Sequence, residues 1–222
     1  MSLTDGAFTE WWADVDRPET RYVKTADGIH IAYQVLGDGP VDLLFAPGFA
    51  SNIDFYWEMP EPAAFLRGLA SFSRLILFDH RGAGLSDRMQ AAEMPPLEVG
   101  MEDIRAVLDA VDSRRPLLFG WQDGGMLCAL FVASYPQRAL GLVLFSSFAR
   151  GLWAPDYPWG DTDAEWEEYL VSLEAGWGSV QQAQEFMEWK GSSLRFDPIA
   201  VRRQAMYWRL SASPVRSLLS NA

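Results

Sequence analysis

The sequence is short of the residues that build disulfides and metal centres. It contains one cysteine, Cys128, and two histidines, His30 and His80. A single cysteine cannot form an internal disulfide, and this set does not supply the ligands of the common zinc sites. We therefore expect neither a metal site nor a bound cofactor.

Long apolar runs and basic clusters are also missing. No stretch approaches the roughly eighteen uncharged apolar residues that a membrane span needs, and the start, MSLTDGAFTEWW, is acidic and aromatic, unlike a signal peptide. The formal net charge of −12 opposes binding to a phosphate backbone. We expect a cytoplasmic protein that binds neither membrane nor nucleic acid.

What the sequence does contain is a series of strand patterns. Residues 29–36 alternate apolar and polar side chains. Four further runs are almost wholly apolar, as in parallel strands that are buried on both faces: 41–48, 74–79, 116–120 and 140–146. Helical patterns over 101–111 and 124–136 lie between them, and this alternation predicts an α/β fold.

The pattern changes after Ser147, because no strand pattern follows and six of the ten tryptophans lie beyond it. Helices are predicted over 163–175 and from the capping residue Asp197 onward. The acidic run DTDAEWEE is interpreted as a solvated helix start rather than a cation site. We divide the chain into an N-terminal extension (1–20), a core (21–147) and a helical, tryptophan-rich lobe (148–222).

The stretch GWQDGG, which follows the apolar run PLLFG, has the form small–x–nucleophile–x–small of a nucleophile elbow. Aligned on Gly120 and Gly124, it puts Gln122 at the nucleophile position, and a carboxamide is not a useful nucleophile. Shifting the register by one makes Asp123 the nucleophile, as in haloalkane dehalogenases, but places Trp121 where a small residue belongs. We prefer to interpret Asp123 as a helix-start carboxylate.

From about Arg21 to Arg150 the chain resembles the α/β-hydrolase superfamily, most of all the hydrolase-like domains joined to bacterial class III adenylate/guanylate cyclases. The resemblance is carried by RYVKTADGIHIAYQVLGDGP, VDLLFAPGFASN, LILFDHRGAGLSDR, MEDIRAVLDAV and ALGLVLFSSFAR. It implies a mostly parallel sheet flanked by helices, with a helical cap lobe. In LILFDHRGAGLSDR it implies a structural role, not a catalytic one, for Arg81 and Asp87.

The same resemblance implies an oxyanion hole. Its donors would be the backbone N–H groups of Phe49, which follows Pro47 and Gly48, and of Asp123. We expect Gly48 and Trp121 to lie at the ligand-binding site beside them.

In this superfamily the acid and the histidine of the triad follow the nucleophile in the chain. No histidine follows Gln122, and no later strand pattern is present, so we expect the chain as written to lack the last strands and the triad. The residues then form either a fragment or a shortened protein. His80 is expected to be a loop residue at the correct sheet edge, and His30 to be packed or solvated.

Two functions follow as hypotheses. One is an esterase-like hydrolase of small apolar acyl substrates, weakly active or inactive as written. The other is a non-catalytic module that binds a small apolar molecule, for example the sensory part of a cyclase-type signalling protein.

Oligomerisation is a third, purely structural role. It follows from the strand at 140–146, which is apolar on both faces. We expect it to be covered either by a second copy of the chain in a homodimer or by helices from 148–222.

Overall fold

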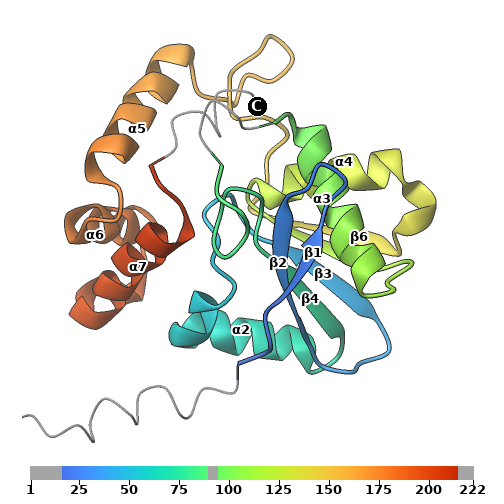
Figure 1. Ribbon diagram of the computed structural model, residues 1–222. Coiled ribbons are helices and arrows are strands. Elements are labelled where there is room, and N and C mark those ends of the chain that lie inside the picture. Colours follow the sequence, from blue (N-terminus) through green and yellow to red (C-terminus); the bar gives the residue numbers. More distant parts are fainter. Residues whose placement is uncertain (1–16, 90–94, 215–222) are drawn as a thin grey trace, which may run out of the picture.

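The computed structural model describes residues 17–89 and 95–214, and a six-stranded sheet runs through its centre (Figure 1). All five predicted strands are confirmed, and one short strand, β1, was not predicted. Most of the expected N-terminal extension lies outside the described residues. The strands are β1 (Arg21–Lys24), β2 (His30–Leu36), β3 (Asp42–Ala46), β4 (Arg74–Phe78), β5 (Leu117–Trp121) and β6 (Gly141–Phe145).

The order of strands across the sheet is β1-β2-β4-β3-β5-β6. β1 pairs antiparallel with β2, and β2 with β4, whereas β4, β3, β5 and β6 run parallel. The carboxyl ends of the four parallel strands therefore meet at one edge. The turn at Gln122 follows β5, so it lies at this edge, where ligands of open α/β sheets bind.

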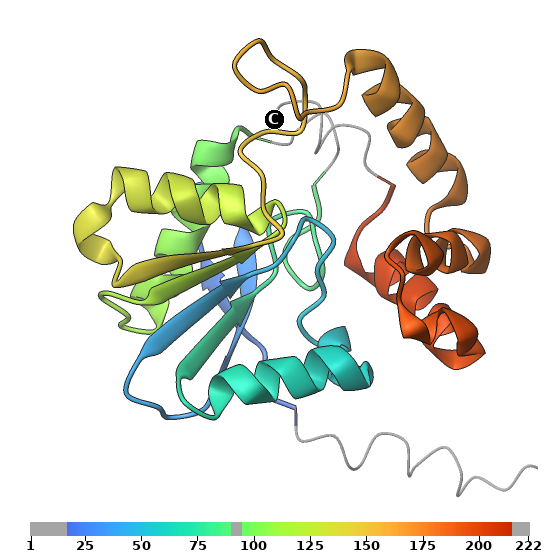
Figure 2. The same cartoon turned by 180° about the vertical axis from the view of Figure 1, so that it is seen from behind.

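Helices cover both faces of the sheet, which explains the apolar strands. Side chains alternate along β3: Leu44 and Ala46 pack with α3 (Leu97–Ala110) and α4 (Gly124–Ser134), while Leu43 and Phe45 face α2 (Pro60–Ala70). Figure 2 shows α2 on one face and α4 on the other. The shorter 3₁₀ helices nearby are η1 (Phe55–Glu58) and η3 (Pro136–Arg138).

The helices predicted over 101–111 and 124–136 are confirmed as α3 and α4, whereas α2 and η1 were not predicted. In α3 the apolar residues with helical spacing are buried, from Met101 to Leu108. α2 begins at Pro60, in the first turn that proline favours, and it buries Ala63 and Leu66.

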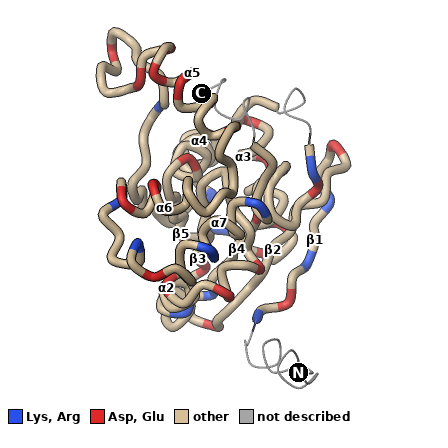
Figure 3. Tube along the Cα trace, turned by 90° about the vertical axis from the view of Figure 1, so that its left-hand side faces the viewer, with Lys and Arg blue, Asp and Glu red and all other residues tan. Residues whose placement is uncertain are grey.

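The segment after β6 is helical, as predicted. It contains α5 (Asp163–Gly176), α6 (Val180–Trp189), η4 (Ser193–Phe196) and α7 (Pro198–Ser211). The acidic run starts α5: Thr162 and Glu165 form a reciprocal capping box, and Figure 3 shows acidic residues gathered at this helix start. The predicted cap of α7 is also present, since Asp197 accepts a hydrogen bond of 2.8 Å from the Ile199 N–H.

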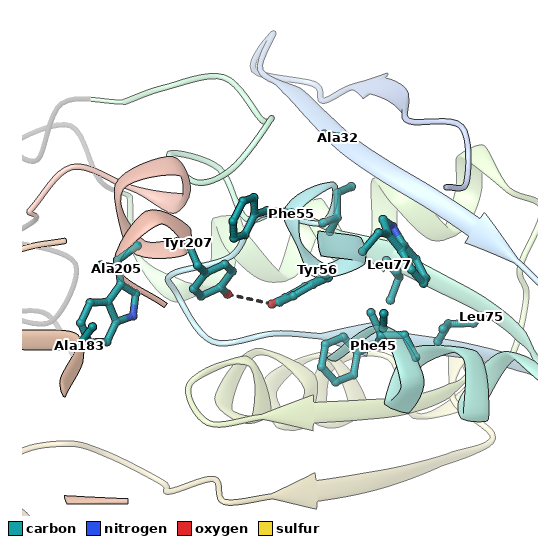
Figure 4. Close-up of a cluster of buried hydrophobic side chains, with 14 of the residues drawn as sticks. Ala32, Phe45, Phe55, Tyr56, Leu75, Leu77, Ala183, Ala205 and Tyr207 are labelled. Atoms are coloured by element: carbon teal, nitrogen blue, oxygen red, sulfur yellow. Dashed lines mark hydrogen bonds between the residues drawn. The ribbon is translucent and has the colours of Figure 1, made fainter. Parts of the chain in front are cut away.

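The helical segment shares a buried cluster with the sheet. Tyr207 of α7 packs in the same cluster as Phe45 of β3 and Tyr56 of η1 (Figure 4). Trp208 belongs to the same cluster. The hydroxyl oxygens of Tyr207 and Tyr56 lie 3.1 Å apart, and the Tyr207 hydroxyl also donates to the Ala50 carbonyl. α7 is thereby tied to the loop that follows β3.

β6 forms an edge of the sheet, with β5 as its neighbour. Three consecutive apolar side chains are exposed there: Val143 (38%), Leu144 (52%) and Phe145 (58%). The expectation that helices from 148–222 cover this strand is therefore wrong for the described residues. α6 and α7 pack instead against the face that carries α2 and η1.

Within residues 17–89 and 95–214, no helix combines the length and the apolar character that a membrane crossing requires.

Candidate functional site

The turn between β5 and α4 has one residue in a strained backbone conformation. Gln122 has φ +54°, in the left-handed region, whereas Asp123 has an ordinary right-handed φ of −65° and ψ of −26°. Such a conformation costs free energy in a residue other than glycine, asparagine or aspartate, and it recurs at functional turns. The backbone therefore puts Gln122, not Asp123, at the sharp point of the turn.

The glycines two positions on either side of Gln122 are sterically required. A Cβ atom on Gly120 would lie 2.4 Å from the Gly125 Cα, and one on Gly124 would lie 2.3 Å from the carbonyl oxygens of Ala46 and Pro47. The start of α4 thus packs directly on the ends of β5 and β3. This close packing is the physical reason for the small–x–x–x–small spacing in the sequence.

The end of β6 supports the turn from its other side. The Gln122 N–H donates to the Phe145 carbonyl at 3.1 Å, and the Ser147 hydroxyl donates to the Gly120 carbonyl at 3.2 Å. Ser146, between these two residues, also has φ +54°. Two residues with left-handed backbones therefore lie next to each other at the carboxyl edge of the sheet.

A cavity of about 430 Å³ opens at this edge. It is lined by Gln122, Ser146, Phe148, Trp189 and Lys190. Sequence reasoning identified the first of these residues and missed the others. Ser146 was detectable, because it directly follows a parallel strand, but the contributions of Trp189 and Lys190, at the end of α6, depend on how the helical segment folds back.

The charge of the cavity comes from Lys190. Partial burial lowers the pKa of its ammonium group, which also lies 5.0 Å from the centre of the Phe186 ring. Trp189 is 80% exposed, so it forms the rim of the cavity and not its floor. The predicted site residue Trp121 is not part of this lining; its ring packs 6.0 Å from that of Phe45 in the core.

The loop after β3 supplies the other predicted site residues, Gly48 and Phe49. The Phe49 N–H donates to Oδ2 of Asp123 at 2.9 Å. A Cβ atom on Gly48 would lie 2.9 Å from Oε1 of Gln122, so the Gln122 side chain lies over this glycine. The structure therefore brings Gly48, Phe49, Gln122 and Asp123 together, and it shows one predicted oxyanion-hole donor already engaged.

Burial governs the electrostatics of Asp123 and His80. Burial raises the pKa of the Asp123 carboxyl, and the hydrogen bond from the Phe49 N–H opposes this rise. Burial likewise lowers the pKa of His80. Its Nε2 lies 2.7 Å from the Pro47 carbonyl oxygen, and because a carbonyl only accepts, this nitrogen carries the proton. His80 thus fixes the peptide that precedes Gly48.

The Asp-x-Arg-Gly-x-Gly-x-Ser stretch that begins at Asp79 holds the core together. The Asp79 carboxylate accepts from the N–H groups of Ile53 (3.0 Å) and Leu85 (2.9 Å), and burial raises its pKa to about 6. Arg81 pairs with the buried Asp103 through two nitrogens, at 2.6 and 2.5 Å. These contacts lie within the protein and are structural.

The remaining candidates for reactive or metal-binding groups are accounted for. His30 is the first residue of β2, at the protein surface, and its Nδ1 lies 3.0 Å from an Asp87 carboxylate oxygen. Cys128 is buried, and burial raises the pKa of its thiol to about 12, so the thiol stays protonated. No cluster of three His, Cys, Asp or Glu side chains suited to a metal ion occurs in the described part of the chain.

Comparison with known proteins shows which family the chain matches. A family model described as "alpha/beta hydrolase fold" matches residues 43–221. Mouse epoxide hydrolase 4 is 28% identical over 127 residues, which cover 56% of this chain and 34% of that protein. Mouse serine hydrolase BPHL is 26% identical over 129 residues, which cover 55% of this chain and 41% of that protein. The chain therefore spans less than half the length of these two relatives.

Solved structures show the same fold. The esterase RhEst1 from Rhodococcus sp. ECU1013 superposes with a TM-score of 0.70 at 22% identity, covering 90% of this chain and 71% of that one. At this identity the likeness concerns the fold and leaves the chemistry of the site to its own residues.

Proposed function

The chain belongs to the alpha/beta hydrolase fold family, and from this premise we propose that it is a small-molecule-binding member with little or no ester hydrolysis. One observation carries the proposal. Gln122 has the left-handed backbone of a nucleophile elbow and lines the cavity at the carboxyl edge of the sheet. The position that supplies the nucleophile in this family is then filled by a carboxamide.

The chemistry of that substitution supports binding over turnover. Covalent catalysis needs a side chain that attacks the substrate after losing a proton or while charged, and a carboxamide is not such a group. The two histidines of the sequence make hydrogen bonds to the Pro47 carbonyl and to Asp87. Neither contact resembles the hydrogen bond between a base and a nucleophile.

The cavity suits a small, largely apolar molecule with one polar group. Phe148 and Trp189 offer apolar surface, and the carboxamide of Gln122 can both donate and accept a hydrogen bond. A cavity of about 430 Å³ lies within the size range of small-ligand sites.

A weak esterase-like activity is the second candidate, and Asp123 is the observation that favours it. In the shifted register this buried carboxylate, at the start of α4 and near the His80 imidazole, would be the nucleophile. The backbone argues against that register, because Asp123 does not have the left-handed conformation. For this reason we rank ligand binding first.

The proposal extends to signalling. The Phe49 ring stacks on Trp177, which in turn stacks on Trp208 of α7, with ring centres 6.3 and 5.8 Å apart. A ligand that shifted the loop of Phe49 would therefore also shift a row of stacked aromatic rings that leads into the helical segment. A sensory role of the kind suggested by the resemblance to cyclase-joined domains would use such a path.

Hydrolysis of p-nitrophenyl esters with two to eight acyl carbons tests the proposal, with the parent chain run beside Gln122→Ser and Asp123→Asn. We expect the parent rate to equal that of buffer, and Gln122→Ser to restore nothing. Parent turnover that Asp123→Asn abolishes would establish Asp123 as the nucleophile and overturn our ranking. A thermal-shift screen of small apolar alcohols, amides and esters then seeks the ligand, with Gln122→Ala expected to lose the stabilisation and Gln204→Ala to keep it.

A further inference from the structure

The Asp123 carboxylate lies where two backbone donors meet. Its Oδ2 accepts a hydrogen bond of 2.9 Å from the Phe49 N–H, and the N–H of Asp123 itself also favours the charged carboxylate. These are the two N–H groups that the elbow geometry would direct at an oxyanion. An acidic oxygen of the protein itself is thus hydrogen-bonded to the first of these groups, the Phe49 N–H.

A purely local role for this carboxylate does not account for the contact. Asp123 directly precedes α4, but its side chain makes no capping hydrogen bond to that helix. It reaches instead across to a loop that is 74 residues away in the sequence. The expectation that Asp123 serves as a helix-start carboxylate therefore misses its main partner.

We infer that Asp123 determines the specificity of the cavity: its carboxylate is a resident anion in the two-donor site, and it excludes ligands that bring a carboxylate or another anionic oxygen to the turn. The inference rests on the proposed function, because it presupposes that ligands enter the cavity beside Gln122. A ligand anion at this point would compete with Asp123 for the Phe49 N–H and would meet the like charge of the carboxylate at short range. Neutral ligands escape both effects.

Removing the Asp123 carboxylate should allow anionic ligands to bind where the parent chain excludes them. In Asp123→Ala the two N–H groups are free, and 4-fluorobenzoate, followed by ¹⁹F NMR, should bind in a saturable manner with a Kd at least about tenfold lower than in the parent chain. The neutral probe 4-fluorobenzamide should change its Kd much less. Asp156→Ala is the matched control, because it removes one exposed carboxylate from the loop before α5 and should leave both affinities as they are.

The possible outcomes separate this inference from the proposed function. Equal benzoate affinities in the parent and Asp123→Ala, or no benzoate binding to either, would overturn the inference, even if 4-fluorobenzamide binds the parent and so supports ligand binding. Benzoate binding to Asp123→Ala alone, with no neutral ligand found for the parent, would support the resident anion and count against the proposed function.

A second measurement covers the case in which Asp123→Ala does not fold. Asp123→Asn keeps the shape of the side chain but removes its charge, so among amides distant in sequence the ¹H–¹⁵N signal of Phe49 should move most. An unmoved Phe49 signal would show that the two residues are not hydrogen-bonded and would overturn the inference.

Discussion

The strain at Gln122 can be measured by comparing alanine with glycine at one position. At φ +54° an alanine keeps the steric cost of a left-handed backbone, about 1 kcal/mol, which a glycine does not have. Glycine also gains conformational freedom in the unfolded chain, which offsets about 0.4–1 kcal/mol of that advantage. We therefore expect Gln122→Gly to be as stable as Gln122→Ala or more stable by up to about 1 kcal/mol.

The same pair of substitutions should give the opposite result at a helical glutamine. Gln204 lies in the middle of α7, where replacing alanine by glycine costs about 1 kcal/mol. The alanine-to-glycine changes at the two positions should thus differ by about 1–2 kcal/mol. For a chain of this length that difference corresponds to a few degrees in Tm.

Urea unfolding of the four variants, followed by circular dichroism and extrapolated linearly, gives the free energies of unfolding. Because both members of each pair lack the glutamine side chain, its contacts cancel. If glycine is less stable than alanine by the same amount at both positions, Gln122 does not have a left-handed backbone. The argument that assigns it to the sharp point of the turn would then fail.

Two further predictions concern protonation and assembly. The pKa of Asp79 is about 6 in the folded chain and about 4 in the unfolded chain. The stabilisation that protonated Asp79 gives the folded state is therefore fully present below pH 4 and is lost as pH rises through 6. The unfolding free energy of the parent, relative to Asp79→Asn, should therefore fall by about 2 kcal/mol between pH 4 and 7 in urea titrations; a flat difference would contradict this. The exposed edge strand β6 should pair with that of a second copy, so sedimentation should show a homodimer that Leu144→Lys weakens at least about tenfold, while Tyr22→Lys on the opposite edge strand has no effect. A parent chain that is monomeric at tens of micromolar would refute the pairing.

Local patterns in the sequence were enough for most of the fold. Four apolar runs predicted four strands, because strands covered on both faces cannot carry polar side chains at low cost, and the alternation over 29–36 predicted a fifth. The spacing of Gly120 and Gly124 predicted the turn, because no larger residue fits between the start of α4 and the strands beneath it. β1 and α2 escaped prediction, since four exposed or half-exposed residues and an irregular proline-rich start give little periodic signal.

The resemblance to the α/β-hydrolase superfamily predicted part of the candidate site. It indicated that Gly48, Phe49, Gln122 and Asp123 belong together, and the folded chain brings them together. It also suggested Trp121, which instead packs in the core, because successive residues at the end of a strand point to opposite faces.

The amino-acid sequence by itself thus determined five of the six strands, the strained turn and the residue at its sharp point, because each depends on neighbours within a few positions. Only the tertiary structure decided that the Asp123 carboxylate binds the Phe49 N–H and that Lys190 lines the same cavity as Gln122. Those contacts join segments far apart in the chain. Their geometry follows from the packing of loops and helices on the sheet, and no local pattern of residues encodes it.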